Sequence, residues 1–343
     1  MRALMLEDFG RLVVVDVPEP VAAPGDVVIE TVATGVCGSD IHGYTGDNGR
    51  RVPGQIMGHE TVGRIHAIGD GVDAAAYPLG AVVTVNPVIL TAEGRSQFAG
   101  REQHDPQRSV LGVDPARNAA FAHRFVVPSQ NVVVLPESMP IAYGALIEPL
   151  AVALNGVRRA GLKPGDAALV VGGGPIGQST VLAAFHQGAS VVYVSELNQS
   201  RRELCERLGA IAIDPRTAPV RDQVVERHGG LVDVAIDAVG IDESLEAALN
   251  STVFGGVVSL VGMGTPRLNL DAYRVSTEER SIVGSFTYSF QVFEDAARWV
   301  AEGDDALAQL ISAEVSLDDA DALFQRLATT ADIPAKALVR FDR

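Results

Sequence analysis

The feature that most constrains the fold is a change of patterning near the middle of the chain. After about residue 150, short apolar runs alternate with stretches of helical periodicity. The runs are Ala167–Val171, Val191–Ser195, Val232–Ala238 and Val257–Val261. They are apolar throughout, as expected of strands that helices cover on both faces. This alternation predicts an α/β fold with a doubly wound parallel sheet.

The rest of the chain has a different character. Residues 1–150 carry short apolar runs bounded by Gly, Pro or Asp, which predict a β-rich domain. These runs are Leu12–Val17, Val27–Val32, Val82–Val85 and Phe125–Val127. A chain of 343 residues exceeds one ordinary core, so we predict two domains. Residues 1–150 form the first and 151–288 the second, and residues 289–343 return to the first.

The returning segment carries two local signals. Ser316 and Asp319 have the spacing of a capping box, which predicts a helix over Ala320–Leu327. The segment PAKALVRF that follows predicts a final strand.

A glycine motif opens the α/β half. Gly172, Gly174 and Gly177 form G-x-G-x-x-G between the run Ala167–Val171 and a helical stretch. In that setting the motif is typical of a dinucleotide site, because the glycines admit a pyrophosphate and the helix N-terminus attracts its charge. The alternative is a glycine-rich turn with no ligand. The residues expected to contact the cofactor are Gly172, Gly174, Pro175, Ile176, Gly177, Glu196, Arg201 and Val239.

Glu196 indicates which dinucleotide is bound. It lies at the end of the next apolar run, nineteen residues after Gly177. A carboxylate there accepts hydrogen bonds from the ribose hydroxyls of NAD and repels the extra phosphate of NADP. Arg201 and Arg202 follow, and they either serve a phosphate or form a solvated helix face.

Possible metal ligands cluster upstream. The segment GVCGSDIHGY contains Cys37, Ser39 and His42, the triplet GHE contains His59 and Glu60, and Glu148 precedes Pro149. Cys, His and Glu are ligands that zinc accepts, and three of them with an open fourth position make a catalytic site. Taken singly, Cys37 is more often a buried small residue and His59 is more often a hydrogen-bonded core residue.

In this order the motifs resemble the medium-chain dehydrogenase/reductase superfamily, in its zinc-containing alcohol and polyol branch, the sorbitol-dehydrogenase-like enzymes. The resemblance covers essentially the whole chain. It implies a GroES-like catalytic domain, a Rossmann domain, and reversible hydride transfer between NAD and a secondary alcohol or polyol. It implies that Cys37 and His59 bind zinc. Glu148 would be a third ligand or an outer carboxylate, and Glu60 an alternative or exchanging ligand, where other alcohol dehydrogenases use a second cysteine.

The resemblance also implies a catalytic group made of Ser39, His42 and Glu60, in which Ser39 and His42 relay the substrate proton to solvent. Two purely structural interpretations remain open: Ser39 caps a helix, and Asp40 braces the turn. Tyr44 and the stretch Phe286–Phe290 either line the substrate pocket or belong to the core or an interface.

A single zinc is expected in each chain. Relatives with a structural zinc hold it with four cysteines in a lobe that corresponds to Asn86–His123, and that stretch contains no cysteine. The remaining thiol, Cys205, lies in a predicted Rossmann helix and reads as core packing.

Composition narrows the partners and the compartment. The net charge of −16 disfavours nucleic acid and anionic lipid, and no apolar run approaches the roughly 18 residues of a membrane span. Two cysteines in all suit a reducing compartment, so the cytoplasm is predicted. We expect a small-molecule alcohol or polyol as substrate and a homodimer or homotetramer. The alternatives are a zinc-free quinone or enone reductase on the same fold and a non-catalytic dinucleotide-binding protein.

Overall fold

The computed structural model describes residues 1–47, 49–330 and 332–342 of the chain. The chain divides into two compact units, which are described separately. Unit 1 comprises Met1–Glu148 together with Ser289–Arg343, and unit 2 comprises Pro149–Tyr288. In the described residues, no helix is long and apolar enough to cross a membrane.

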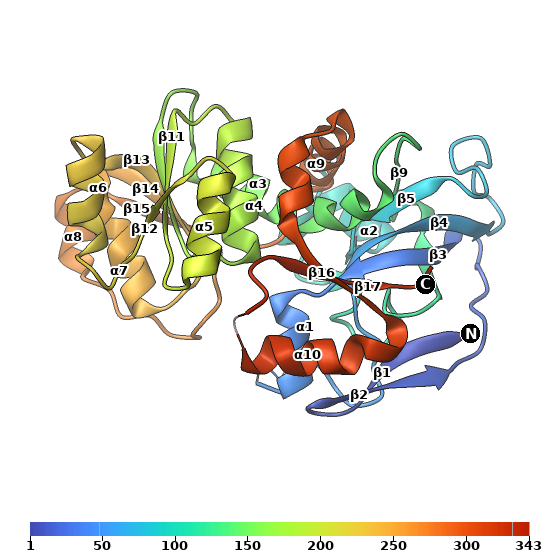
Figure 1. The fold of residues 1–343 in the computed structure, drawn as a ribbon. Helices are drawn as coiled ribbons and strands as arrows, with labels where there is room; N and C mark the ends of the chain where they lie inside the picture. Colours follow the sequence, from blue (N-terminus) through green and yellow to red (C-terminus); the bar gives the residue numbers. More distant parts are fainter. Residues whose placement is uncertain (48, 331, 343) are drawn as a thin grey trace. The chain divides into compact units, whose positions relative to one another are not determined.

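Unit 2 is built on a six-stranded sheet with the order β12-β11-β10-β13-β14-β15, in which every neighbouring pair is parallel (Figure 1). Its strands are β10 (Ala167–Val171), β11 (Val191–Ser195), β12 (Ile211–Ile213), β13 (Val232–Asp237), β14 (Thr252–Leu260) and β15 (Ser281–Gly284). Its helices are α3 (Ile147–Ala160, which begins in unit 1), α4 (Pro175–His186), α5 (Gln199–Arg207), α6 (Val220–His228), α7 (Asp242–Ser251) and α8 (Ala272–Thr277).

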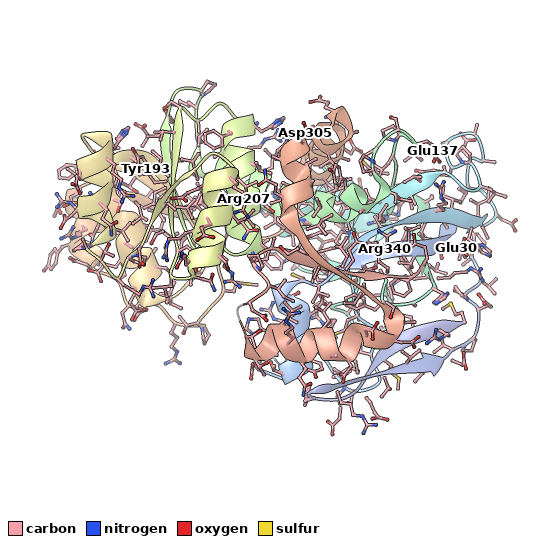
Figure 2. The ribbon with its side chains drawn as sticks, in the orientation of Figure 1. Glu30, Glu137, Tyr193, Arg207, Asp305 and Arg340 are labelled. Carbon is pink, nitrogen blue, oxygen red and sulfur yellow. The ribbon has the colours of Figure 1, made fainter. Side chains whose placement is uncertain are left out.

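The apolar runs of the sequence form the centre of this sheet. All five residues of β10 are buried, and Tyr193 of β11, labelled in Figure 2, is only 2% exposed. The strand order extends outward on both sides of β10, which is the doubly wound arrangement. The predicted α/β class and parallel sheet are therefore confirmed.

Unit 1 contains a sheet with the order β16-β17-β3-β4-β5-β9, and β8 also pairs with β3. Its strands are β1 (Arg2–Asp8), β2 (Arg11–Asp16), β3 (Asp26–Gly35), β4 (Glu60–Ile68), β5 (Val82–Val85), β6 (Val88–Ile89), β7 (Ser109–Val110), β8 (Arg124–Pro128), β9 (Val132–Val134), β16 (Ile311–Ser316) and β17 (Lys336–Arg340). Its other helices are α1 (Gly38–Thr45), α2 (Ala92–Gln97), α9 (Phe290–Glu302) and α10 (Ala320–Thr329), with 3₁₀ turns η1 (Glu102–His104), η2 (Ser129–Asn131), η3 (Ile141–Leu146), η4 (Asp305–Leu310) and η5 (Leu317–Asp319).

Strand β3 is the centre of unit 1. It pairs with β4, β8 and β17, so the end of the chain lies beside a strand formed near its beginning. The pairing aligns Gly35 with Glu60 on one side and with Leu338 on the other. The end of β3 therefore gathers side chains from three distant parts of the sequence.

The predicted capping box at Ser316 is not formed. Ser316 Oγ donates to Asp319 Oδ2 at 2.6 Å, and the residues between them make the 3₁₀ turn η5. Helix α10 then begins after Asp319, whose side chain makes no capping bond. The two side chains bond to each other instead of to the helix amides, because the 3₁₀ turn moves the start of the helix past Ser316.

Candidate active site

Cys37 is placed by the junction between β3 and α1. The strand ends at Gly35, and Cys37 is the extended residue that precedes helix α1, with φ −85° and ψ 152°. Its backbone N–H donates to Asp40 Oδ2 at 3.1 Å, so Asp40 braces the turn as one interpretation foresaw. The thiol is half-buried, whereas Asp40 is fully buried. Asp40 thus contributes a buried negative charge one turn from the thiol.

His59 and Glu60 enter the same region at the start of β4. His59 is 5% exposed and Glu60 is not exposed at all. One ligand atom each from Cys37, His59 and Glu60 lie within 4.8 Å of one another, the one such group among the described residues. Glu148, in the first turn of α3, is buried but lies outside this group.

A lysine holds Glu60 in place. Lys336, the first residue of β17, is buried, and its Nζ donates to Glu60 Oε1 at 2.7 Å. Gly35 makes room for the carboxylate, because an added Cβ would lie 2.4 Å from Glu60 Oε2. Burial pulls the pKa of Lys336 down, but Glu60, Cys37 and Glu148 together hold that pKa above its ordinary value.

A buried arginine, Arg51, pairs with Asp40 in this cluster. Arg51 Nη2 lies 3.4 Å from Asp40 Oδ1, and His59 Nδ1 lies 3.6 Å from the same oxygen. Burial lowers the pKa of His59, but Asp40, Cys37 and Glu148 outweigh it and raise that pKa to about 10. The anions around His59 therefore attract a cation strongly.

The cluster suits a divalent metal. Glu60 Oε2 is buried and has no hydrogen-bond partner among the described residues, so it is free to bind a cation. Four acidic side chains and two permanently basic ones interact in this cluster. The acidic side chains are Cys37, Asp40, Glu60 and Glu148, and the basic ones are Lys336 and Arg51. If all four acids are ionised and His59 is neutral, as a metal ligand must be, two negative charges remain, which is the charge that one zinc ion neutralises.

Ser39 and His42 both lie on α1, three residues apart, so they occupy neighbouring positions on one face of the helix. Ser39 is half-buried and His42 is exposed. Helix α1 therefore carries a hydroxyl near the cluster and an imidazole at the surface. The residue that precedes the helix is Cys37, so Ser39 is not its N-cap.

The dinucleotide motif forms the expected strand–loop–helix. Strand β10 ends at Val171, and helix α4 begins at Pro175 with Gly174 as its N-cap. Glu196 Oε2 accepts from the N–H of Gly173 at 2.7 Å, which ties the acid to the glycine loop. Val239 reaches the loop from the end of β13, since an added Cβ at Gly172 would lie 2.5 Å from its Cγ2.

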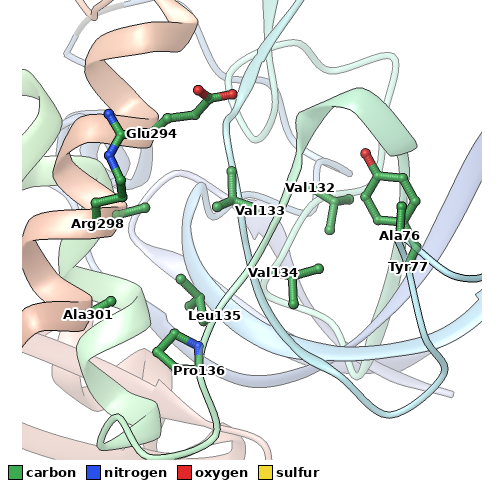
Figure 3. A pocket seen from close by; sticks show the side chains of 11 residues that line it. Ala76, Tyr77, Val132, Val133, Val134, Leu135, Pro136, Glu294, Arg298 and Ala301 are labelled. Atoms are coloured by element: carbon green, nitrogen blue, oxygen red, sulfur yellow. The ribbon is translucent and has the colours of Figure 1, made fainter.

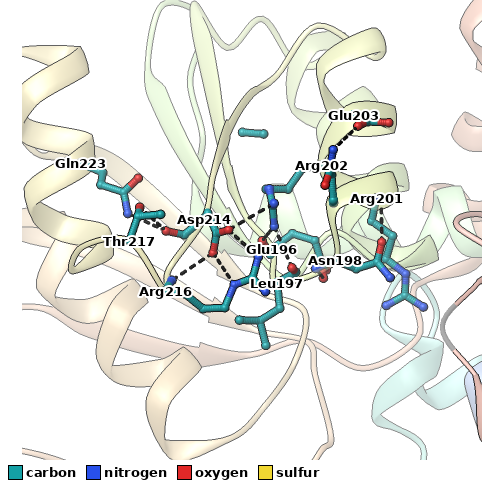
Figure 4. A network of polar contacts seen from close by, with 12 residues as sticks. Glu196, Leu197, Asn198, Arg201, Arg202, Glu203, Asp214, Arg216, Thr217 and Gln223 are labelled. Atoms are coloured by element: carbon teal, nitrogen blue, oxygen red, sulfur yellow. Dashed lines mark hydrogen bonds and ion pairs between the residues drawn. The ribbon is translucent and has the colours of Figure 1, made fainter.

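The two arginines of α5 differ in their surroundings (Figure 4). Arg202 donates to the backbone oxygens of Glu196 and Leu197 and pairs with Asp214 at 3.2 Å, so it holds the loop together. Arg201 is half-buried beside Gly174, and its Nε has no partner in the described part of the chain. The solvated-face interpretation is therefore wrong for Arg202, whereas both interpretations still apply to Arg201.

Of the remaining sequence candidates, Tyr44, Tyr288 and Cys205 are core residues and Phe286 is not. Tyr44 is 3% exposed, its hydroxyl donates to the Gly10 oxygen, and its ring packs 5.6 Å from that of Phe324. Tyr288 is fully buried, whereas Phe286 is 41% exposed. Cys205 is buried, and burial raises the pKa of its thiol to about 12, which agrees with a packing role.

An open groove of about 470 Å³ lies elsewhere in unit 1. Figure 3 shows Glu294 and Arg298 of α9 on one side of it, Val132–Pro136 in the middle and Tyr77 on the other. None of the residues of the Cys37 cluster lines this groove, so it is a separate surface feature.

Comparisons with known proteins bear on this site. Residues 23–137 match the model of the alcohol dehydrogenase GroES-like domain, and residues 175–302 match that of zinc-binding dehydrogenases. The chain is 33% identical over 315 residues to (R,R)-butanediol dehydrogenase of Bacillus subtilis, which covers 88% of this chain and 89% of that protein. The chain belongs to the zinc-binding dehydrogenases. It is therefore an enzyme, an oxidoreductase of a family that uses zinc and NAD or NADP on small molecules.

Two more relatives extend the comparison. An L-threonine 3-dehydrogenase of Pyrococcus abyssi is 36% identical over 266 residues, which covers 76% of this chain and 74% of that protein. A zinc-binding dehydrogenase of Sinorhizobium meliloti solved with NADP aligns with a TM-score of 0.90 at 30% identity and covers 99% of both chains. The predicted family and fold class are confirmed.

Sequence reasoning missed Lys336 and Arg51. Neither belongs to a motif, and Lys336 lies 276 residues from Glu60 along the chain. One signal was available for Lys336: it is one of only two lysines in the sequence, and it begins an apolar strand.

Proposed function

We propose that this zinc-binding dehydrogenase oxidises a secondary alcohol or polyol to a ketone, reversibly, with NAD as the hydride acceptor. The observation that carries the proposal is that ligand atoms of the half-buried Cys37 and the buried His59 and Glu60 lie within 4.8 Å of one another. In a catalytic zinc site, three protein ligands leave the fourth position to water or substrate.

We assign the metal ligands to Cys37, His59 and Glu60, with Glu148 as a nearby acid that contributes charge and can exchange with Glu60. The unpartnered Oε2 of Glu60 supports this order, because Lys336 occupies only Oε1. When bound, zinc supplies a Lewis acid at the substrate oxygen, and the nicotinamide supplies the hydride acceptor.

The chain itself handles the proton of the substrate hydroxyl. Ser39 accepts it near Cys37, and His42, one turn along α1, passes it to solvent. The half-buried position of Ser39 and the exposed position of His42 support a path that runs outward along this helix. Imidazole suits the outer position because it can both accept and donate a proton.

NAD is the proposed cofactor. Glu196 adds a negative charge at the glycine loop, which disfavours the additional phosphate of NADP. Arg201, beside Gly174, is placed to meet the pyrophosphate. Gly172, Pro175, Ile176, Gly177 and Val239 complete the proposed cofactor contacts.

The substrate class follows from the relatives. Their names specify a butanediol and the 3-position of threonine, and both compounds carry a secondary hydroxyl beside a second polar group. A vicinal diol or polyol is therefore the proposed substrate of this chain.

A single zinc per chain is proposed. Hydrogen bonds hold the stretch Asn86–His123, where the family resemblance would put a second metal. Glu102 accepts from the N–H groups of Gly100 and Phe290, and Asp105 accepts from the N–H of Gln107. Both oxygens of Glu102 and Oδ1 of Asp105 are therefore committed to backbone amides, while Asp105 Oδ2 is buried without a partner among the described residues. The three committed oxygens support a lobe that folds without metal.

A homo-oligomer is proposed, a dimer or a tetramer. Strand β15 is at the edge of the unit 2 sheet, and the segments flanking it in sequence expose Leu270, Tyr273 and Phe286 by 42%, 81% and 41%. An edge strand with apolar neighbours is suited to pairing with a second copy. The proposed location is the cytoplasm, since Cys37 and Cys205 are both free thiols.

The test is a screen of secondary alcohols, diols and polyols with NAD, following the absorbance of the reduced cofactor. Turnover of one of these substrates should be lost when a chelator removes the metal and should be restored when zinc is added. Reduction of quinones or enones by chelated protein would favour the zinc-free reductase. Absence of turnover in both directions with zinc-loaded protein would refute the proposed substrate class.

A further inference from the structure

The charged side chain of Arg51 is buried, which costs desolvation free energy. Its side chain is 1% exposed, and its Nη2 lies 3.4 Å from Oδ1 of the fully buried Asp40. Its Nε has no hydrogen-bond partner in the described part of the chain. A buried guanidinium is expensive unless its charge is paired, so Asp40 accounts for its presence there.

The fold makes room for this arginine. An added Cβ at Gly43, on α1, would lie 2.3 Å from Cγ of Arg51 and 3.3 Å from Sδ of Met57. Helix α1 therefore keeps a gap on the face that Arg51 crosses. The stem of Arg51 fills the gap, and its head is directed at the carboxylate.

Asp40 connects Arg51 to the proposed metal ligands. One carboxylate oxygen accepts from the N–H of Cys37 at 3.1 Å. The other faces both Arg51 and Nδ1 of His59, at 3.4 Å and 3.6 Å. At 3.6 Å, Asp40 Oδ1 attracts the N–H of His59 Nδ1 without forming a hydrogen bond. A carboxylate on the Nδ1 side of a metal-binding histidine orients the ring so that Nε2 is left for the metal.

We propose that Arg51 is a positioning residue of the metal site, which holds Asp40 so that Asp40 orients His59 toward the metal. The inference rests on the proposed zinc site. Bracing α1 alone does not require Arg51, because the Cys37 N–H binds the other oxygen of Asp40.

The proposal predicts the direction of an affinity change. Removing a cation near a metal site raises zinc affinity if charge alone matters. Loss of an outer partner that orients a ligand instead lowers metal affinity, typically 10–100-fold. Arg51→Met should therefore bind zinc at least about tenfold more weakly than the wild type, and Arg51→Lys should recover part of the loss.

The experiment is a zinc titration of the full chain against a chromophoric chelator. It compares the wild type, Arg51→Met, Arg51→Lys and the matched control Arg50→Met, which removes a neighbouring exposed charge. The same variants are made in an Asp40→Asn background, where Arg51→Met should have little further effect. Cobalt-loaded protein adds a visible spectrum, which should change with Arg51→Met and not with Arg50→Met.

Unchanged or tighter zinc binding by Arg51→Met would overturn the inference, as would an equal loss in the Asp40→Asn background. If Arg51→Met alone does not fold, two other proteins decide whether the inference holds. They are Arg51→Lys and the double variant Asp40→Asn/Arg51→Met, which buries neither charge. If the wild type holds no zinc that depends on Cys37, it is the proposed function that fails.

Discussion

Replacing Lys336 with methionine gives a sharp test of the charge balance at the metal cluster. The substitution keeps most of the side-chain volume but removes the cation 2.7 Å from Glu60 Oε1. Both side chains are at most 5% exposed, so water cannot replace the lost partner. Removing one member of a buried pair typically costs about 3–5 kcal/mol.

For a unit of roughly 200 residues, that loss lowers Tm by roughly 6–20 °C in metal-free protein. Zinc offers Glu60 a replacement cation, so the rise in Tm on adding zinc should be larger in Lys336→Met than in the wild type. Differential scanning calorimetry with and without zinc measures both quantities.

The control is Lys163→Met, which removes the only other lysine of the chain from an exposed position. It should leave Tm and the zinc effect unchanged. A metal-free Lys336→Met protein that melts with the wild type would refute the reasoning, because it would mean that Glu60 does not depend on Lys336 for its charge.

Three further predictions concern cofactor, proton path and metal uptake. Because Glu196 repels the additional phosphate, kcat/KM should favour NAD over NADP by at least about tenfold, which is ~1.4 kcal/mol; equal use would mean that Arg201 recruits that phosphate. His42→Ala should slow turnover mainly near neutral pH, and an added small base should restore part of it; an unchanged pH–rate profile removes His42 from the path. Since the pKa of His59 is raised to about 10 without metal, zinc must displace its proton at pH 8. Zinc uptake should then release at least about one proton per site, measured by calorimetry in buffers of different ionisation enthalpy, and no release would contradict the raised pKa.

The sequence predicted the strands that are apolar and bounded by helix breakers. The runs Val82–Val85, Ala167–Val171 and Val191–Ser195 match β5, β10 and β11 residue for residue. Burial on both faces leaves such runs without polar positions, so their limits are visible in the residues themselves. Strand β4 was missed, because it mixes Arg64 and His66 with apolar residues at one half-exposed end.

The candidate site was predicted as far as its motifs reach. Cys37, His59 and Glu60 stand in short recognisable segments, and the structure brings them together. The pairs that support them depend on β17 lying beside β3 and on space beside Gly43, which no local pattern encodes. For this reason Lys336 and Arg51 emerged only from the folded chain.

Tyr44 is a residue whose role the sequence could not decide. The residue next to a catalytic motif read equally as a pocket wall or as core, and the structure places it in the core against Phe324. Adjacency in sequence could not decide, because successive residues of α1 point in different directions around the helix axis.

The most direct test of the account is the amount of zinc held by purified protein, with and without Cys37. Elemental analysis should find about one zinc per wild-type chain and almost none in a folded Cys37→Ser variant, with turnover lost in parallel. Two tightly held zinc ions per chain, or one that remains in Cys37→Ser with unchanged turnover, would contradict the assignment of the site.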